Sequence, residues 1–136
     1  MRPVQPGRRL TERRVAAVHA AYYVSSGLWP LLHRSSFERL TGRKTDFWLA
    51  QTVGVTVSAI GAGLAHTASR RRPVPAELRT VACAAAAGLA SIDLLFVARR
   101  QISPVYLLDA ATEAALISAW AASGRSVPRD SQLGDE

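Results

Sequence analysis

The chain has 136 residues, with 17 Lys and Arg against 10 Asp and Glu, a formal charge of +7, one cysteine and 49% hydrophobic residues. This length fits a single domain, and the lone thiol, Cys83, excludes an intrachain disulfide framework and a cysteine-based zinc site. The charged residues are gathered in five short blocks separated by four almost uncharged stretches. This pattern argues against a disordered basic tail and against an ordinary water-soluble domain.

The four apolar stretches predict four transmembrane helices, because each is close to the ~20 residues that cross a ~30 Å hydrocarbon core. They run over 15–33, 47–68, 80–98 and 105–122, and the first two contain no Asp, Glu, Lys or Arg. A soluble bundle would carry charge on the outer face of every helix. The predicted fold is therefore an all-α bundle of four transmembrane helices. The alternative is a soluble helical protein that buries these faces in a large oligomer.

The first stretch also has features of a secretory signal peptide, with a basic segment before it and small residues at Ser25, Ser26 and Gly27. Its apolar character continues to Leu32 without a small-x-small cleavage site, which favours a retained span. Thr11 is the candidate N-cap of this helix.

A short helix is predicted in the connection that follows the first stretch. Ser35 and Glu38 fit the S-x-x-E capping box, which places this helix near 36–40. Gly42 then lies where a glycine commonly stops a helix.

The sequence divides into a basic N-terminus (1–14), a transmembrane domain (15–122) and a polar tail (123–136). The distribution of charge predicts how the chain is oriented in the membrane. With both termini inside, the inner side holds eleven Lys and Arg and the outer side holds six. The positive-inside rule therefore places both termini in the cytoplasm. Because the basic residues are divided between two faces of a membrane and few aromatic residues lie among them, nucleic-acid binding is not expected.

The acidic residues within the third and fourth stretches are the most informative polar groups. A central Asp in a membrane span costs ~2.5–3.5 kcal/mol even on a mild scale, so such groups need partners or protons. Asp109 and Glu113 are four residues apart and share one helix face. Asp93 lies about as far before the end of its helix as Asp109 lies after the start of the next, so we expect both at one depth.

This depth argument predicts a polar site at the end of the bundle that the orientation makes the outer one. Two interpretations remain open. One is a pocket that binds a cationic or polar small molecule or relays protons. The other is a buried ion-pair network, in which a basic residue of the first connection (Arg34, Arg39, Arg43 or Lys44) folds back over the acids as a lid. The candidate ligand-binding residues are Asp93, Asp109, Glu113, Gln51, His33, Arg34, Lys44 and Tyr106.

A second polar set lies on the first predicted span, where His19, Tyr23 and Ser26 fall near one helix face and predict interhelical hydrogen bonds. The three scattered histidines have no cysteine partner and predict no metal site. Neither a cofactor nor a catalytic residue is assigned.

Small residues form one face on each of the second and third predicted spans, and such faces let helix backbones approach closely. We therefore expect these two spans to pack together, within one chain or across a dimer. The residues are Gly54, Ser58, Gly61, Ala62 and Ala65 on the second span, and Ala84, Ala87, Gly88 and Ser91 on the third.

Two runs, SFERLTGRKTDFWL from Ser36 to Leu49 and SPVYLLDA from Ser103 to Ala110, resemble small uncharacterised four-helix membrane proteins of bacteria. The architecture also resembles the DoxX-like small membrane proteins. The resemblance implies four spans and a bacterial inner (plasma) membrane location, and it implies no activity that can be carried over.

The predicted function is that of a small integral membrane protein with an outward-facing polar pocket, which binds a small molecule or supports a membrane complex. The alternatives are a small proton-coupled transporter or channel, and a membrane enzyme that uses Glu113 as a general acid or base on a lipid-like substrate. No GxSxG, P-loop, HExxH or GxGxxG motif is present, so an enzyme is not favoured. The expected partners are the lipid bilayer, a small-molecule ligand, and further copies of the chain or of a membrane complex.

Overall fold

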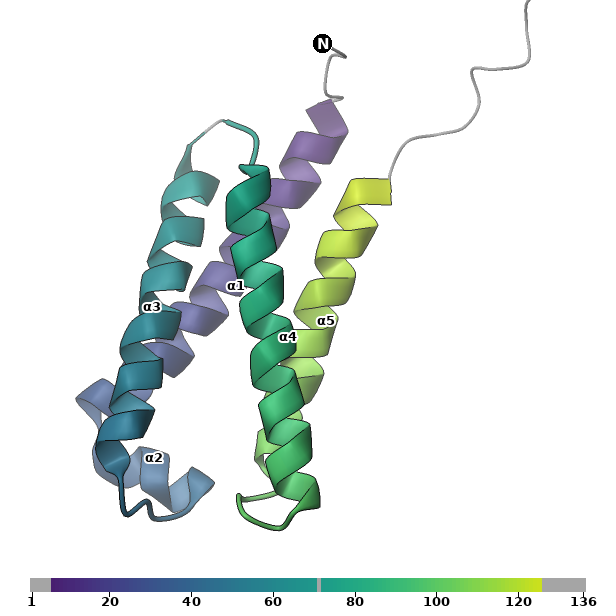
Figure 1. Ribbon diagram of the computed structural model, residues 1–136. Coiled ribbons are helices and arrows are strands. Elements are labelled where there is room, and N and C mark those ends of the chain that lie inside the picture. The colour runs from purple at the N-terminus through teal and green to yellow at the C-terminus, as the bar shows by residue number, and fades with distance from the viewer. Residues whose placement is uncertain (1–5, 71, 126–136) are drawn as a thin grey trace, which may run out of the picture.

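The structure, a computed structural model, describes residues 6–70 and 72–125, and every regular element in these ranges is an α-helix. Four long helices lie side by side, and a short helix lies across one end of the bundle (Figure 1). The all-α prediction is confirmed, and most of the predicted polar tail lies outside the described residues. The helices are α1 (Pro6–Leu32), α2 (Arg34–Thr41), α3 (Phe47–Ser69), α4 (Ala76–Ala98) and α5 (Tyr106–Arg125).

The long helices associate as two pairs. Helix α1 packs along α3, and α4 packs along α5, while a smaller contact between α1 and α5 joins the pairs. Helices α3 and α4 scarcely touch, so the prediction that the second and third spans pack together within one chain is wrong, and their packing across a dimer remains a prediction. Gly54, Ser58 and Gly61 of α3 face α1 instead, and a Cβ atom on Gly27 would lie only 2.6 Å from the Gly54 carbonyl oxygen. Glycine at both positions allows the two backbones to meet.

Two predicted helix starts are wrong. Helix α1 begins at Pro6, so Thr11 lies inside it, and its hydroxyl donates to the Gly7 carbonyl at 3.1 Å. Proline suits a first turn because its missing N–H would have no helical partner there. Helix α2 is capped by His33, whose Nδ1 accepts from the Ser36 backbone N–H at 3.2 Å, in place of the predicted capping box.

The predicted end of α2 is confirmed. Gly42 follows the helix with a φ of 87°, and its N–H donates to the Glu38 carbonyl. This is the left-handed region in which a residue without a Cβ is favoured. The chain then turns into α3.

The turn between α4 and α5 brings their acidic residues together. Arg100 adopts a φ of 55°, its N–H donates to the Val97 carbonyl, and the Gln101 N–H donates to the Phe96 carbonyl. These two bonds are the Schellman pattern, which reverses the chain tightly at a helix end. Helix α5 can therefore return alongside α4.

The core is small and built largely from alanine, while many large apolar side chains lie on the outer surface. The buried cluster consists of Ala16, Ala20, Leu64, Ala82 and Trp120. Val55, Ile92 and Leu108 are examples of exposed apolar residues, and Leu108 is 70% exposed. By length and composition, α3 and α4 are able to cross a membrane. Four spans and their orientation remain predictions.

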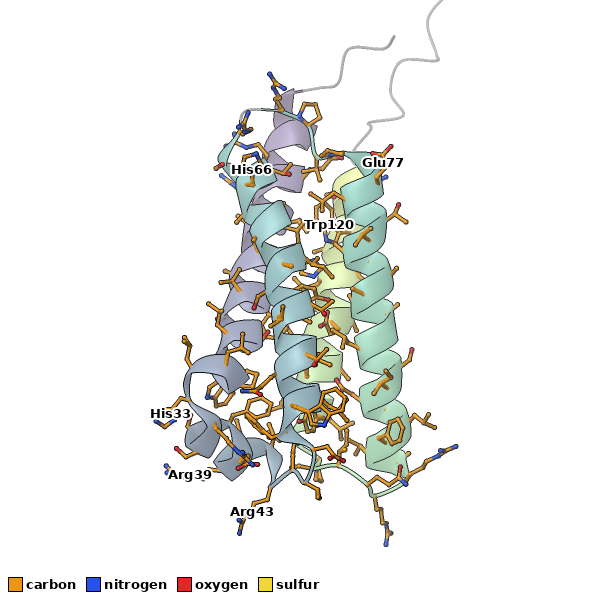
Figure 2. All side chains as sticks on the ribbon, turned by 60° about the vertical axis from the view of Figure 1, so that its left-hand side comes forward. His33, Arg39, Arg43, His66, Glu77 and Trp120 are labelled. Carbon is orange, nitrogen blue, oxygen red and sulfur yellow. The ribbon has the colours of Figure 1, made fainter. Side chains whose placement is uncertain are left out.

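The two ends of the bundle carry different residues. Glu77 and His66 lie at the end where α3 stops and α4 starts, whereas His33, Arg39 and Arg43 lie at the α2 end (Figure 2). Trp120 lies between the helices (Figure 2).

Candidate functional site

Three acidic side chains, Asp93, Asp109 and Glu113, come together inside the bundle, and we call them the carboxyl cluster. The Asp93 carboxyl group lies within hydrogen-bonding reach of that of Asp109, and Glu113 is close enough to both to interact through its charge. Asp93 is only 6% exposed and Glu113 only 1%. The convergence follows from the tight α4–α5 turn and from the one-turn spacing of Asp109 and Glu113.

Helix α1 supplies a tyrosine to each acid of α5. The Tyr22 hydroxyl donates to Asp109 Oδ1, and the Tyr23 hydroxyl donates to Glu113 Oε2 at 3.1 Å. Adjacent residues on a helix point in directions about 100° apart, so the pair straddles the line along which α1 meets α5. The carboxyl cluster is therefore held by neutral hydroxyl groups from the opposite half of the bundle.

A histidine and a tryptophan continue the polar interior beyond Tyr23. The His19 and Tyr23 rings meet edge to face with centroids 4.2 Å apart. Trp120 Nε1 donates to His19 Nδ1 at 3.1 Å. Because an indole N–H can only donate, Nδ1 must accept, which places the proton of the neutral imidazole on Nε2.

Two atoms of this polar interior are buried without a hydrogen-bond partner among the described residues: His19 Nε2 and Asp93 Oδ2. Burial of a polar atom without a partner costs about 1–3 kcal/mol, and such atoms are rare in folded proteins. The interior thus contains an unused donor on α1 and an unused acceptor on α4. These are the groups that a polar ligand would satisfy.

The expected ion-pair lid over the acids is wrong within the described part of the chain, where no ion pair joins a Lys or Arg to the carboxyl cluster. Arg34 instead pairs with Glu38, four residues along the same helix, at 3.2 Å. Lys44 Nζ lies 5.2 Å from the centre of the Tyr106 ring. Arg34 has an acidic partner on its own helix, and Lys44 has an aromatic ring within reach, so neither side chain needs to extend to an acid on another helix.

Glu38 organises the connection at this end. The hydrogen bonds from Arg34 hold the pKa of this carboxyl group below its usual value, and the Lys44 backbone N–H, 3.1 Å from Oε1, adds to the effect. A charged Glu38 therefore fixes α2 to the segment that follows it.

The remaining predicted site residues do not join the carboxyl cluster. Arg34 and Gln51 line a separate groove where α1, α2 and α3 meet. His33 is exposed and caps α2, and the half-buried Tyr106 lies against Lys44. The structure thus divides the predicted site between two places, and ligand binding by these residues remains a prediction.

Sequence reasoning found His19 and Tyr23 on one face of the first helix but did not connect them with the acids. The signal that could have done so is a matched spacing: His19 and Tyr23 are four apart, as are Asp109 and Glu113. Trp120 lies seven residues after Glu113, on the same face. Two antiparallel faces with this pattern can meet residue for residue.

No group of three or more His, Cys, Asp or Glu side chains arranged to hold a metal ion occurs in residues 6–70 and 72–125. No family model, curated protein or solved structure matches the chain. The fold and the site define an all-helical protein with a cluster of three carboxyl groups inside its bundle.

Proposed function

We propose that the chain is a four-span membrane protein of the bacterial inner membrane whose carboxyl cluster binds a small cationic molecule. The observation that carries this proposal is the convergence of three acids inside the bundle without a described basic side chain opposite them. Asp93 and Glu113 are buried, and Asp93 has an unpaired oxygen. Uncompensated carboxyl groups in a region of low dielectric attract a cation strongly.

The surface supports the membrane placement. Polar side chains such as His19 and Glu113 are fully buried, while Val18, Val55 and Leu94 are exposed, which is the reverse of a water-soluble helical bundle. Helix α1 begins with a basic segment, and α5 carries Asp109 and the inward-facing Glu113. These residues lower the average hydropathy of both helices below that of α3 and α4. The inward polar face is compatible with a span, because the outward face alone meets lipid.

The unpaired Asp93 oxygen favours a binding site over a purely supporting role in a complex, because a scaffold would be stabilised by pairing every buried acid. A through-going transport path is less well supported. Ala16, Leu64 and Ala82 are fully buried in an apolar cluster on the side of His19 away from the acids. Such a cluster separates the carboxyl cluster from the other end of the bundle.

The test is thermal unfolding of the protein in lipid nanodiscs with ethylammonium chloride or, at equal ionic strength, sodium chloride. Ethylammonium should stabilise the protein more than sodium, by about 1.4 kcal/mol at ten times its Kd. Glu113→Gln should reduce this difference, because the substitution removes one of the three carboxyl groups that attract the cation.

Glu77→Gln is the matched control, since Glu77 is exposed at the opposite end of the bundle. It should retain the response to ethylammonium. Equal responses of the two variants, or equal stabilisation of the unaltered protein by both salts, would count against a cation site at the carboxyl cluster.

A further inference from the structure

A groove separate from the carboxyl cluster lies where the end of α1, the start of α2 and the start of α3 meet. It has a volume of about 490 Å³, within the ~300–1,000 Å³ typical of small-molecule sites. Its lining residues are Pro30, Leu31, Leu32, Arg34, Thr45, Phe47, Trp48 and Gln51. Neither the proposed cation site nor the core of the bundle uses this groove.

One part of the groove is apolar and open to the surroundings. Pro30 and Phe47 are buried and form part of its wall, while Leu32 is 77% exposed and Trp48 is 62% exposed. Tryptophan is enriched where a membrane meets water, because its ring is apolar and its N–H is polar. An acyl chain would find apolar contacts along Leu32 and Trp48.

The other part of the groove is polar and includes one cation. The Arg34 guanidinium carbon lies 4.4 Å from the centre of the Phe47 ring. Its Nε and Nη2 bond to Glu38, while Nη1 makes no hydrogen bond within the described residues. Guanidinium groups suit phosphate oxygens, and the side chains of Thr45 and Gln51 add neutral hydrogen-bonding groups.

The surrounding charge favours an anion. The α2 end carries more basic than acidic residues, and Figure 2 shows Arg39 and Arg43 projecting there. Lys44 lies at the same connection. The basic residues at this end are Arg34, Arg39, Arg43, Lys44, Arg99 and Arg100. The acidic residues are Glu38 and Asp46 and, farther inside the bundle, those of the carboxyl cluster.

We propose that this groove binds an anionic phospholipid, with the phosphate at Arg34 and the beginning of an acyl chain along Leu32 and Trp48. The proposal rests on the membrane placement proposed above but not on the carboxyl cluster. An anionic headgroup is attracted by the charge at this end. A basic residue that lines the groove, as Arg34 does, adds about 1 kcal/mol to such binding, which is about fivefold in affinity, and basic residues outside the groove add less. A zwitterionic lipid would gain less from the same contacts.

The experiment is native mass spectrometry of the full chain released from nanodiscs that contain equal amounts of phosphatidylglycerol and phosphatidylcholine. The unaltered protein should retain phosphatidylglycerol preferentially. Arg34→Gln should reduce this retention about fivefold. Arg39→Gln, which removes the same charge from an exposed site on α2 outside the groove, should change it much less.

Several results would overturn the proposal. Equal retention of the two lipids by the unaltered protein would do so without any variant, as would equal losses in Arg34→Gln and Arg39→Gln. Displacement of phosphatidylglycerol by inorganic phosphate would identify a site for a soluble anion instead. If Arg34→Gln does not fold, Arg34→Lys takes its place, and unchanged retention by this variant would exclude a specific guanidinium contact.

Carbonate extraction of the membranes distinguishes failure of the lipid-binding proposal from failure of the proposed function. Release of the chain into the carbonate wash would contradict the membrane placement and hence both proposals. A chain that stays in the membrane but shows no lipid preference contradicts the lipid groove alone. Loss of the ethylammonium response alone contradicts the cation site alone.

Discussion

Tyr23 connects the two halves of the polar interior. Its ring contacts the His19 ring, and its hydroxyl donates to Glu113 on another helix. The side chain is fully buried, so without Glu113 its hydroxyl group would lose its hydrogen bonds to water and gain no bond to the protein in exchange. A single hydroxyl thus links α1 to the deepest acid of the carboxyl cluster.

Tyr23→Phe should therefore lower the free energy of unfolding by about 1–3 kcal/mol, because it leaves a buried carboxyl oxygen without its donor. The measurement is equilibrium unfolding in mixed micelles. Tyr106→Phe makes the same chemical change at a hydroxyl that forms no hydrogen bond within the described residues, and it should have a much smaller effect. Equal losses in the two variants would argue against a stabilising Tyr23–Glu113 bond.

Some of this residue-level geometry could be predicted from the sequence. The spacing of Asp109 and Glu113 and the depth of Asp93 indicated one common region. The identity of their partners could not be predicted, because a basic residue in a flexible connection has several acids within reach. Arg34 pairs with Glu38 one helical turn away, and this local pair requires no tertiary contact.

At the scale of the helices, the crossing of α1 and α3 depends on backbone contact. A Cβ atom on Gly54 would collide with the Gly27 carbonyl oxygen and lie 3.1 Å from Pro30 Cγ. A Cβ atom on Gly61 would likewise lie only 3.0 Å from Tyr23 Cβ. The small residues therefore set the distance between these helices, and with it the position of the tyrosines on α1.

Gly54→Ala should destabilise the protein by about 1–3 kcal/mol, because the added methyl group must push the two backbones apart. Gly88 on α4 is the control, since a Cβ atom there meets nothing within 4 Å. Gly88→Ala should be neutral or stabilising by up to ~1 kcal/mol, because alanine loses less entropy in a helix. Detergent-induced unfolding followed by circular dichroism measures both, and a larger loss in Gly88→Ala would contradict this account.

The sequence indicated that α3 approaches another helix closely, but it did not indicate which one. A face of small residues indicates that another helix packs closely against it. Which helix this is depends on the position of a glycine on the partner helix. Gly27 provides it, in a stretch whose small residues are also a feature of a signal peptide and therefore did not point to a helix contact. The comparable face of α4, which includes Ala84, Ala87 and Gly88, remains exposed in the described structure.

At the scale of the whole molecule, α1 begins and α5 ends at the same end of the bundle, opposite α2 (Figure 1). Four spans would therefore place positions 39 and 101 on one side of a membrane and position 72 on the other. The count of basic residues adds the direction, with the α2 end outside.

This topology is tested by single cysteines in a Cys83→Ala background. In intact cells, a membrane-impermeant maleimide should label Arg39→Cys and Gln101→Cys but not Arg72→Cys until the cells are opened. Labelling of position 72 alone would reverse the orientation while keeping the number of spans. Labelling of 39 but not 101 in intact cells would contradict an even number of spans between them.

The limited contact between the α1–α3 and α4–α5 pairs has a mechanical consequence. Tyr22, Tyr23 and Trp120 form side-chain hydrogen bonds between the two pairs, and the acceptors of the two tyrosines are the carboxyl groups of Asp109 and Glu113. A ligand that binds these acids must compete with the tyrosine hydroxyl groups, and these hydroxyl groups also connect the two helix pairs. Ligand binding at the carboxyl cluster and the association of the two helix pairs are then thermodynamically coupled, so that a change in one must change the other.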